Sequence, residues 1–139
     1  MRRLFLSLAA VASLSLSAGS IAPVIAGEIS AAIPEGVKVL TALEIKALQA
    51  KQTVYIFDSR DKEAFDKAHI EGAASLPLKT FDLAQLPKDK AAQIVFYCGG
   101  PSCPLAPTSA GKARAAGYTN VAVYHEGIEN WNKTGAKKS

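Results

Sequence analysis

The sequence contains little cysteine, histidine or aromatic residue. Its 139 residues include two cysteines, two histidines and one tryptophan, and aromatic residues make up 7% of the chain. His69 and His125 do not stand at metal-ligand spacing from either cysteine, so we expect no zinc site, no other metal and no cofactor. Cys98 and Cys103 lie five positions apart, and a disulfide closing so short a loop would restrict the unfolded chain only modestly. The cysteines are therefore not expected to serve mainly as a structural cross-link.

The excess of positive charge is small and partly confined to the N-terminus. Lysine and arginine outnumber aspartate and glutamate by 16 to 12, which gives a formal net charge of +4. Two of the arginines belong to residues 1–26, and without that segment the net charge falls to about +2. No basic stripe with interleaved aromatic residues is then left, so we expect no nucleic-acid partner.

Residues 1–26 have the pattern of a secretory signal peptide. A short positive start, M-R-R, precedes an uncharged apolar run at 4–16 and a stretch of small residues that ends in V-I-A at 24–26. The apolar run is too short and too rich in Ala and Ser to span a membrane comfortably, so we expect no stable membrane anchor after cleavage. The sequence predicts an exported protein, periplasmic in a Gram-negative bacterium or otherwise secreted. R-R-L-F-L at 2–6 also resembles a twin-arginine signal, so the export route stays open.

The remaining chain predicts one α/β domain. We assign residues 27–36 to an irregular lead-in, 37–135 to the domain and 136–139 to a polar tail. Apolar runs predict strands at 37–40, 54–57, 73–78, 94–97 and 121–124. Helical patterns cover 41–50, 61–67, 107–116 and 128–131, with a turn or short helix at 81–86, a capping box at Thr41 and Glu44, and a stop at Gly117. This alternation favours a mainly parallel sheet with helices on both faces and a site at the carboxyl ends of its strands.

Cys98 is the residue best placed to carry chemistry, because it directly follows the apolar strand predicted at 94–97. A thiolate is a strong nucleophile, but a free thiol near neutral pH is mostly protonated. Loop amides and the dipole of the following helix can favour the charged form. We expect the backbone after Cys98 to form an anion cradle that binds substrate, built from Gly99, Gly100, Pro101, Ser102 and Cys103. From these residues alone, a buried and inert cysteine is the alternative.

Two regions of the chain resemble the rhodanese-like domain family. The first, residues 54–78, contains D-x-R at 58–60, H-I-x-G-A at 69–73 and L-P at 76–77. The second, residues 94–131, contains the strand, the cysteine, the helix, G-Y-x-N-V at 117–121 and G-I-x-x-W at 127–131. The resemblance covers almost all of the chain after residue 26 in the expected order. It implies a single domain with a sheet of about five parallel strands and flanking helices.

The resemblance also implies a sulfurtransferase. The family's cysteine position maps onto Cys98 and not onto Cys103. Cys98 would accept a sulfane sulfur as a persulfide from a small donor, such as thiosulfate or a polysulfide, and pass it to a thiol acceptor or another nucleophile. The acceptor can be a small thiol or a protein. The identities of donor and acceptor, and the oligomeric state, are left open.

The sequence departs from the family pattern in the charge of its loop. The commonest loop of the family includes Arg or Lys, whereas no cationic residue stands between Gly99 and Gly111. Stabilisation of dianionic thiosulfate must then come from amides, with Arg60 of the neighbouring strand end as a further candidate for substrate binding. Pairing with Asp58 is the alternative role of Arg60. The missing cation also argues against a phosphatase, whose loop holds phosphate with an arginine.

The second departure is Cys103, a possible resolving thiol. It can attack a persulfide on Cys98 or take part in dithiol–disulfide exchange, and whether the two cysteines form a disulfide is left open. Two alternative functions follow. One is periplasmic thiol–disulfide exchange through Cys98 and Cys103, and the other is a non-catalytic rhodanese-fold module that binds a partner.

Overall fold

The computed structural model describes residues 31–134. The expected signal peptide at 1–26, the first part of the lead-in and the tail at 136–139 lie outside the described residues. Within the described part of the chain, every helix is too short or too polar to cross a lipid bilayer.

The strands form one sheet in the order β1-β5-β4-β2-β3, and all of its neighbouring strands are parallel. They are β1 (Lys38–Val39), β2 (Val54–Asp58), β3 (Ala73–Ser75), β4 (Gln93–Tyr97) and β5 (Val121–Tyr124). This confirms the predicted α/β class and the parallel sheet. The edge strands β1 and β3 are shorter than predicted. After β3, the backbone N–H of Leu76 still donates to the carbonyl of Asp58, but the chain then bends into a 3-10 turn at Leu78.

The helices are α1 (Ala42–Gln49), α2 (Lys62–Lys67), α3 (Leu105–Ala115) and α4 (Gly127–Trp131), with 3-10 turns at Leu78–Thr80, Leu83–Gln85 and Asn132–Thr134. The predicted capping box of α1 is confirmed. The backbone N–H of Thr41 donates to Glu44 Oε2 at 2.8 Å, and that of Glu44 donates to Thr41 Oγ1 at 3.3 Å. The predicted start of the next long helix, at residue 107 or 108, was wrong, because α3 begins at Leu105. Pro107 fits its first turn, where a missing N–H removes no intrahelical hydrogen bond.

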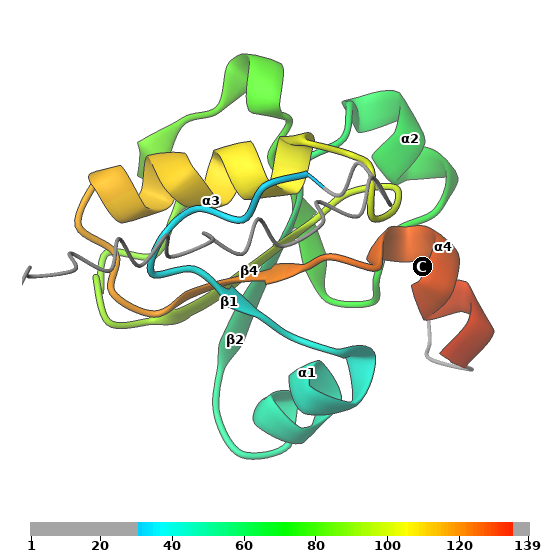
Figure 1. Ribbon diagram of the computed structural model, residues 1–139, viewed down its shortest axis with the longest axis horizontal. Coiled ribbons are helices and arrows are strands. Elements are labelled where there is room, and N and C mark those ends of the chain that lie inside the picture. The colour runs from blue at the N-terminus through cyan, green and yellow to red at the C-terminus, as the bar shows by residue number, and fades with distance from the viewer. Residues whose placement is uncertain (1–30, 135–139) are drawn as a thin grey trace, which may run out of the picture.

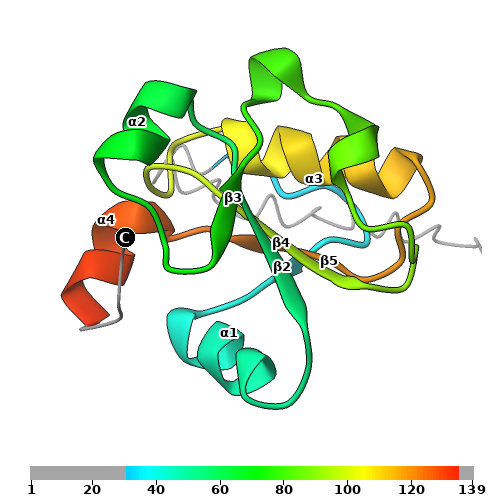
Figure 2. The same ribbon diagram turned by 180° about the vertical axis from the view of Figure 1, so that it is seen from behind.

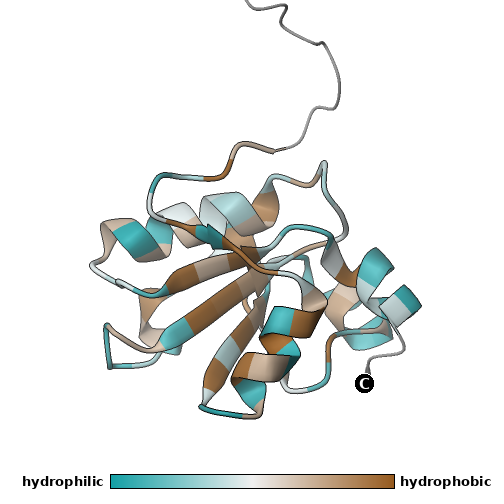
Figure 3. Ribbon diagram, turned by 60° about the horizontal axis from the view of Figure 1, so that its bottom comes forward, coloured by the Kyte–Doolittle hydropathy of each residue, from teal (hydrophilic) through white to brown (hydrophobic). Residues whose placement is uncertain are grey.

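Helices cover both faces of the sheet, as predicted (Figure 1). Seen from behind, α3 again lies on one side of the sheet and α1 on the other (Figure 2). Successive residues of β4 point to opposite faces. Ile94 and Phe96 pack with α3, whereas Val95 and Tyr97 pack with residues of α1 and α4. The central strands are accordingly apolar along most of their length (Figure 3), because both of their faces are buried.

Candidate active site

Cys98 lies at the carboxyl edge of the sheet, directly after the central strand β4 and before the loop that leads to α3. Its side chain belongs to the core on the α3 face, together with Phe96 and Ala106. Only 3% of the residue is exposed. Both cysteines are free thiols in this structure.

The sulfur of Cys98 faces one backbone acceptor and two backbone donors. Its thiol donates to the carbonyl oxygen of Cys103 at 3.4 Å. Burial raises the pKa of the thiol to about 12, and the hydrogen bond and charge interaction with the side chain of Cys103 act in the same direction. The backbone amides of Ala106 and Gly99 act against them by favouring the thiolate. In this conformation of the loop, Cys98 is therefore held as a neutral thiol.

The loop after Cys98 is held from the opposite side by the start of α4. The backbone N–H of Ile128 donates to the carbonyl of Cys98 at 2.9 Å, and that of Glu129 donates to the carbonyl of Gly99 at 3.2 Å. Gly127 has φ +69°, and a Cβ at this position would lie 2.6 Å from the backbone nitrogen of Gly100. Glycine is therefore required at residue 127 both for its backbone conformation and for the close approach of the two chain segments. The sequence contained this glycine within the G-I-x-x-W motif, but the pattern alone did not connect it to the loop.

The predicted cradle residues have different surroundings. Of their amides, that of Gly99 faces the sulfur, whereas that of Cys103 donates to the carbonyl of Gly100 at 3.1 Å. Pro101 has no N–H and is exposed, as is Ser102. The second amide at the sulfur comes from Ala106, which the sequence did not indicate. A prediction that the helix starts at residue 105 would have identified this amide. Ala106 lies in the first turn of α3, where amides have no partner within the helix.

Arg60 forms a local ion pair at the end of the neighbouring strand β2. Its Nη2 lies 2.6 Å from Oδ2 of the buried Asp58, and its Nε lies 3.0 Å from Oδ1. Nη2 also donates to the carbonyl of Ala68 at 2.7 Å. Burial alone lowers the pKa of the Arg60 guanidinium, but the hydrogen bond and charge of Asp58 raise it overall. Pairing with Asp58 is the alternative role that the sequence indicated for Arg60. In this conformation the guanidinium is bonded to Asp58 and to the carbonyl of Ala68.

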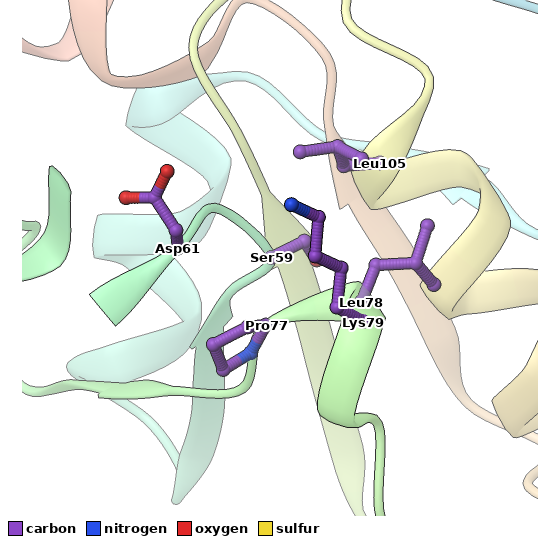
Figure 4. A pocket seen from close by; sticks show the side chains of 6 residues that line it. All are labelled: Ser59, Asp61, Pro77, Leu78, Lys79 and Leu105. Atoms are coloured by element: carbon purple, nitrogen blue, oxygen red, sulfur yellow. The ribbon is translucent and has the colours of Figure 1, made fainter. Parts of the chain in front are cut away.

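A pocket of about 260 Å³ opens between the segment after β2, the turn after β3 and the start of α3 (Figure 4). It is lined by Ser59, Asp61, Pro77, Leu78, Lys79 and Leu105. The register of β2 and β4 pairs Asp58 with Tyr97, so the next residues along, Ser59 and Cys98, are neighbours across the two strand ends. The hydroxyls of Ser59 and Ser109 lie 3.0 Å apart, which links the end of β2 to α3. Cys98 itself does not line the pocket. It is related to the lining through Ser59, across the strand ends, and through Leu105, which directly precedes Ala106.

Within residues 31–134, no group of three or more His, Cys, Asp and Glu side chains is arranged to hold a metal ion. His69 has a local role. Its ring stacks on Phe65 with centroids 3.8 Å apart, and Nδ1 lies 2.9 Å from the carbonyl oxygen of Phe65.

The chain is similar to a curated protein over about two thirds of its length. It is 32% identical over 98 residues to the HTH-type transcriptional regulator Rv0324 of Mycobacterium tuberculosis (strain ATCC 25618 / H37Rv). The matched region covers 69% of this chain and 42% of the regulator, so the chain spans less than half the length of that relative.

Solved structures share the fold. The BH2092 protein from Bacillus halodurans is 27% identical with a TM-score of 0.63, and the match covers 73% of this chain and 76% of that one. The human single-domain sulfurtransferase TSTD1 is 20% identical with a TM-score of 0.62, over 72% and 99% of the two chains. A thiosulfate sulfurtransferase from Pseudomonas aeruginosa is 22% identical with a TM-score of 0.64, over 74% and 20%. The last two likenesses concern the fold alone.

The family comparison covers strands β2 to β5 and the loop that contains both cysteines. Residues 41–134 match the family described as Rhodanese-like domain. Together with the parallel sheet and the cysteine at the end of β4, this match shows that the chain belongs to the rhodanese-like domain family.

Proposed function

We propose that this protein is a sulfurtransferase that carries sulfane sulfur as a persulfide on Cys98. One observation carries the proposal. Cys98 stands at the carboxyl end of the central strand with its sulfur facing the amides of Gly99 and Ala106, which favour the thiolate against the effect of burial. Membership of a family that includes sulfurtransferases supports it.

The reaction consists of two displacements. The Cys98 thiolate attacks the outer sulfur of the donor, the donor's S–S bond breaks, and the leaving group takes the electron pair. With thiosulfate the leaving group is sulfite, and the total charge is unchanged. A thiolate of the acceptor then attacks the outer sulfur of the persulfide, and the Cys98 thiolate leaves. No electron enters or leaves the system from another reagent.

The described conformation corresponds to the resting state of this cycle. At neutral pH, a thiol with a pKa of about 12 contains very little thiolate. The carbonyl of Cys103, which accepts a hydrogen bond from the thiol, repels a negative sulfur. Formation of the thiolate breaks this hydrogen bond and leaves the amides of Gly99 and Ala106 as the donors that stabilise it.

We propose a small sulfane-sulfur compound, thiosulfate or a polysulfide, as the donor and a thiol, free or on a protein, as the acceptor. We also propose export to the periplasm or the exterior, on the pattern of residues 1–26. N-terminal sequencing of the protein recovered from an exporting host tests this step. A mature N-terminus at residue 27 supports export, and an intact leader in the soluble cytoplasmic fraction contradicts it.

Thiol–disulfide exchange through Cys98 and Cys103 is a second candidate function. It is favoured by the direct contact between the Cys98 thiol and the backbone of Cys103, which brings the two residues together across the loop. In this reaction the thiolate of one cysteine attacks a disulfide substrate and forms a mixed disulfide, and the first substrate thiol leaves. The second cysteine then attacks the mixed disulfide, which forms the Cys98–Cys103 disulfide and releases the second substrate thiol. The high pKa of Cys98 does not separate the two candidates, because both reactions begin with a thiolate.

Intact-mass measurement on the reduced protein tests the proposal. The wild type, Cys98→Ser and Cys103→Ser are each incubated with thiosulfate and with polysulfide. We expect the wild type and Cys103→Ser to gain one sulfur atom and Cys98→Ser to gain none. Cys103→Ser is the matched control, because it removes a thiol from the same loop.

The other outcomes separate the alternatives. Loss of two hydrogens under a mild oxidant, without any gain of sulfur, identifies the dithiol pair as the functional unit. If neither donor adds sulfur and no disulfide forms, the catalytic proposal is rejected. A rhodanese-fold module that only binds a partner is then the explanation to test, and Cys98→Ser should leave such binding intact.

A further inference from the structure

The pocket between the segment after β2, the turn after β3 and the start of α3 is lined by one cationic side chain, whereas the loop after Cys98 has none. No lysine or arginine stands between Gly99 and Gly111, yet Lys79 lines the pocket beside the loop. Lys79 belongs to the 3-10 turn Leu78–Thr80, which follows β3 and packs against α3. Its ammonium group extends upward into the opening, toward Leu105 at the start of α3 (Figure 4). The fold thus brings a cation from a distant part of the sequence to the edge of the catalytic loop.

The charge of Lys79 is available to a ligand. Lys79 is exposed and takes part in none of the ion pairs between described residues, which join Arg60 to Asp58, Lys62 to Asp66 and Lys67 to Glu63. Asp61 is the acid that shares the pocket. Its Oδ1 accepts a hydrogen bond at 2.8 Å from the backbone N–H of Ala64, as the N-cap of α2, so this carboxylate already has a partner.

The walls of the pocket suit a small anion with one polarisable end. Pro77, Leu78 and Leu105 supply apolar surface, and Ser59 is the lining residue that lies across the strand ends from Cys98. The volume of about 260 Å³ equals that of roughly nine waters at about 30 Å³ each. A molecule with an anionic head at Lys79 would therefore direct its other end toward Ser59 and the cysteine. A sulfane-sulfur anion has this form, because its outer sulfur is transferred while its charged head leaves.

We infer that Lys79 is the binding cation for an anionic sulfane-sulfur donor in the pocket next to Cys98. The inference rests on the proposed sulfurtransferase function and specifies its substrate class. In the thiosulfate reaction, the Cys98 thiolate forms a bond to the outer sulfur, the S–S bond of thiosulfate breaks, and sulfite leaves with the electron pair. Lys79 holds the sulfonate oxygens before the reaction and the sulfite oxygens after it, and its proton stays on the ammonium group.

Three lysine variants test the inference in the first displacement. Lys79→Gln removes the charge with little change in size, and Lys79→Arg keeps the charge. Lys51→Gln is the matched control, because the exposed Lys51 lies between α1 and the start of β2, at the opposite edge of the sheet. The rate of sulfur gain on Cys98 is followed by intact mass as the thiosulfate concentration is varied.

We expect Lys79→Gln to raise the half-saturating thiosulfate concentration by about five- to tenfold, as expected for loss of a partly exposed charge-assisted hydrogen bond. The maximal rate should change little, because the charge is held in both the bound donor and the product. Lys79→Arg and Lys51→Gln should stay within about twofold of the wild type, since each keeps the charge at the pocket. Added salt should weaken thiosulfate use by the wild type more than by Lys79→Gln. Equal half-saturation for the wild type and Lys79→Gln would overturn the inference and leave the proposed function standing.

A binding measurement separates failure of this inference from failure of the function. Titration calorimetry with thiosulfate compares Cys98→Ser with the double variant Cys98→Ser/Lys79→Gln, in which no sulfur transfer can occur. Weaker binding by the double variant supports Lys79 as the anion site even if the wild type gains no sulfur. Identical binding by the two variants, or no binding by either, rejects it.

Discussion

The neighbouring strands β2 and β4 end side by side, but the end of β2 holds an ion pair and the end of β4 holds a neutral thiol. At the end of β2, the buried carboxylate of Asp58 is satisfied by the backbone and guanidinium of Arg60. At the end of β4, the thiol of Cys98 donates to the carbonyl of Cys103 and takes part in none of the ion pairs between described residues, Arg60–Asp58, Lys62–Asp66 and Lys67–Glu63. A buried charge is stable only when it is paired and hydrogen-bonded, so the first end is structural. The second end holds a neutral thiol in this conformation, and we call it the reactive end because it carries the nucleophile of the proposed function.

Removal of the carboxylate of Asp58 is the strongest way to break the structural end. Asp58→Ala leaves the guanidinium of Arg60, whose side chain is only 17% exposed, without its anion. We expect a loss of about 3 kcal/mol in the free energy of unfolding, measured by urea denaturation. Glu63→Gln is the control, because the Glu63–Lys67 pair is largely exposed and its loss should cost less than about 0.5 kcal/mol. A similar small loss in both variants would contradict the contrast between the two strand ends.

Thiol alkylation measures the reactive end directly. Cys98 in Cys103→Ser should react with iodoacetamide at least about a hundredfold more slowly than Cys103 in Cys98→Ser at neutral pH, because little of Cys98 is thiolate and little is exposed. Its rate should rise with pH without reaching a plateau below about pH 10. Equal rates for the two cysteines at neutral pH would show that the loop does not hold the neutral thiol.

The same pKa predicts how stability depends on pH. Folding raises the pKa of Cys98 from about 8.5 in an unfolded chain to about 12, so the folded state binds this proton more tightly. The contribution is fully present below about pH 8.5 and is lost as pH rises toward the folded value. Urea denaturation from pH 7 to 10 should show a smaller decrease in stability for Cys98→Ser than for the wild type.

Gly127→Ala tests how far the reactive end depends on its support from α4. The alanine has to adopt a positive φ, and its methyl group meets the backbone of Gly99 and Gly100. We therefore expect a loss of about 2 to 3 kcal/mol in the free energy of unfolding. Gly117→Ala is the matched control. Gly117 also has a positive φ, but a Cβ there would contact nothing within 4 Å, so its cost should be about 1 kcal/mol. Equal losses for the two variants would mean that close packing on the loop contributes nothing.

The smallest expected effect concerns the hydroxyl pair that joins the β2 end to α3. Ser59→Ala leaves the buried hydroxyl of Ser109 without this partner, and we expect a loss of about 1 kcal/mol. The double variant Ser59→Ala/Ser109→Ala should lose less than the sum of the single variants, since no hydroxyl is then left alone. Strict additivity in a denaturation cycle would exclude an interaction between the two hydroxyls.

Local patterns predicted the central elements better than the edges. The apolar runs that became β4 and β5 were placed within one residue, because strands buried on both faces have a continuous apolar sequence. Thr41 and Glu44 identified the start of α1, since a capping box involves residues only three positions apart. The extents of β1 and β3 and the start of α3 were wrong. Those limits depend on neighbouring strands and on the loop, not on local composition.

The sequence alone placed Cys98 at the carboxyl end of a buried strand, predicted the α/β class and pointed to the rhodanese-like family. Tertiary structure decided what surrounds the sulfur. It placed the carbonyl of Cys103 and the amide of Ala106 there, directed Arg60 to Asp58, and carried Lys79 to the pocket. The physical reason is the range of the interactions. Strand and helix patterns arise from residues a few positions apart, whereas a site at a sheet edge is assembled by strand register and turns that join distant segments.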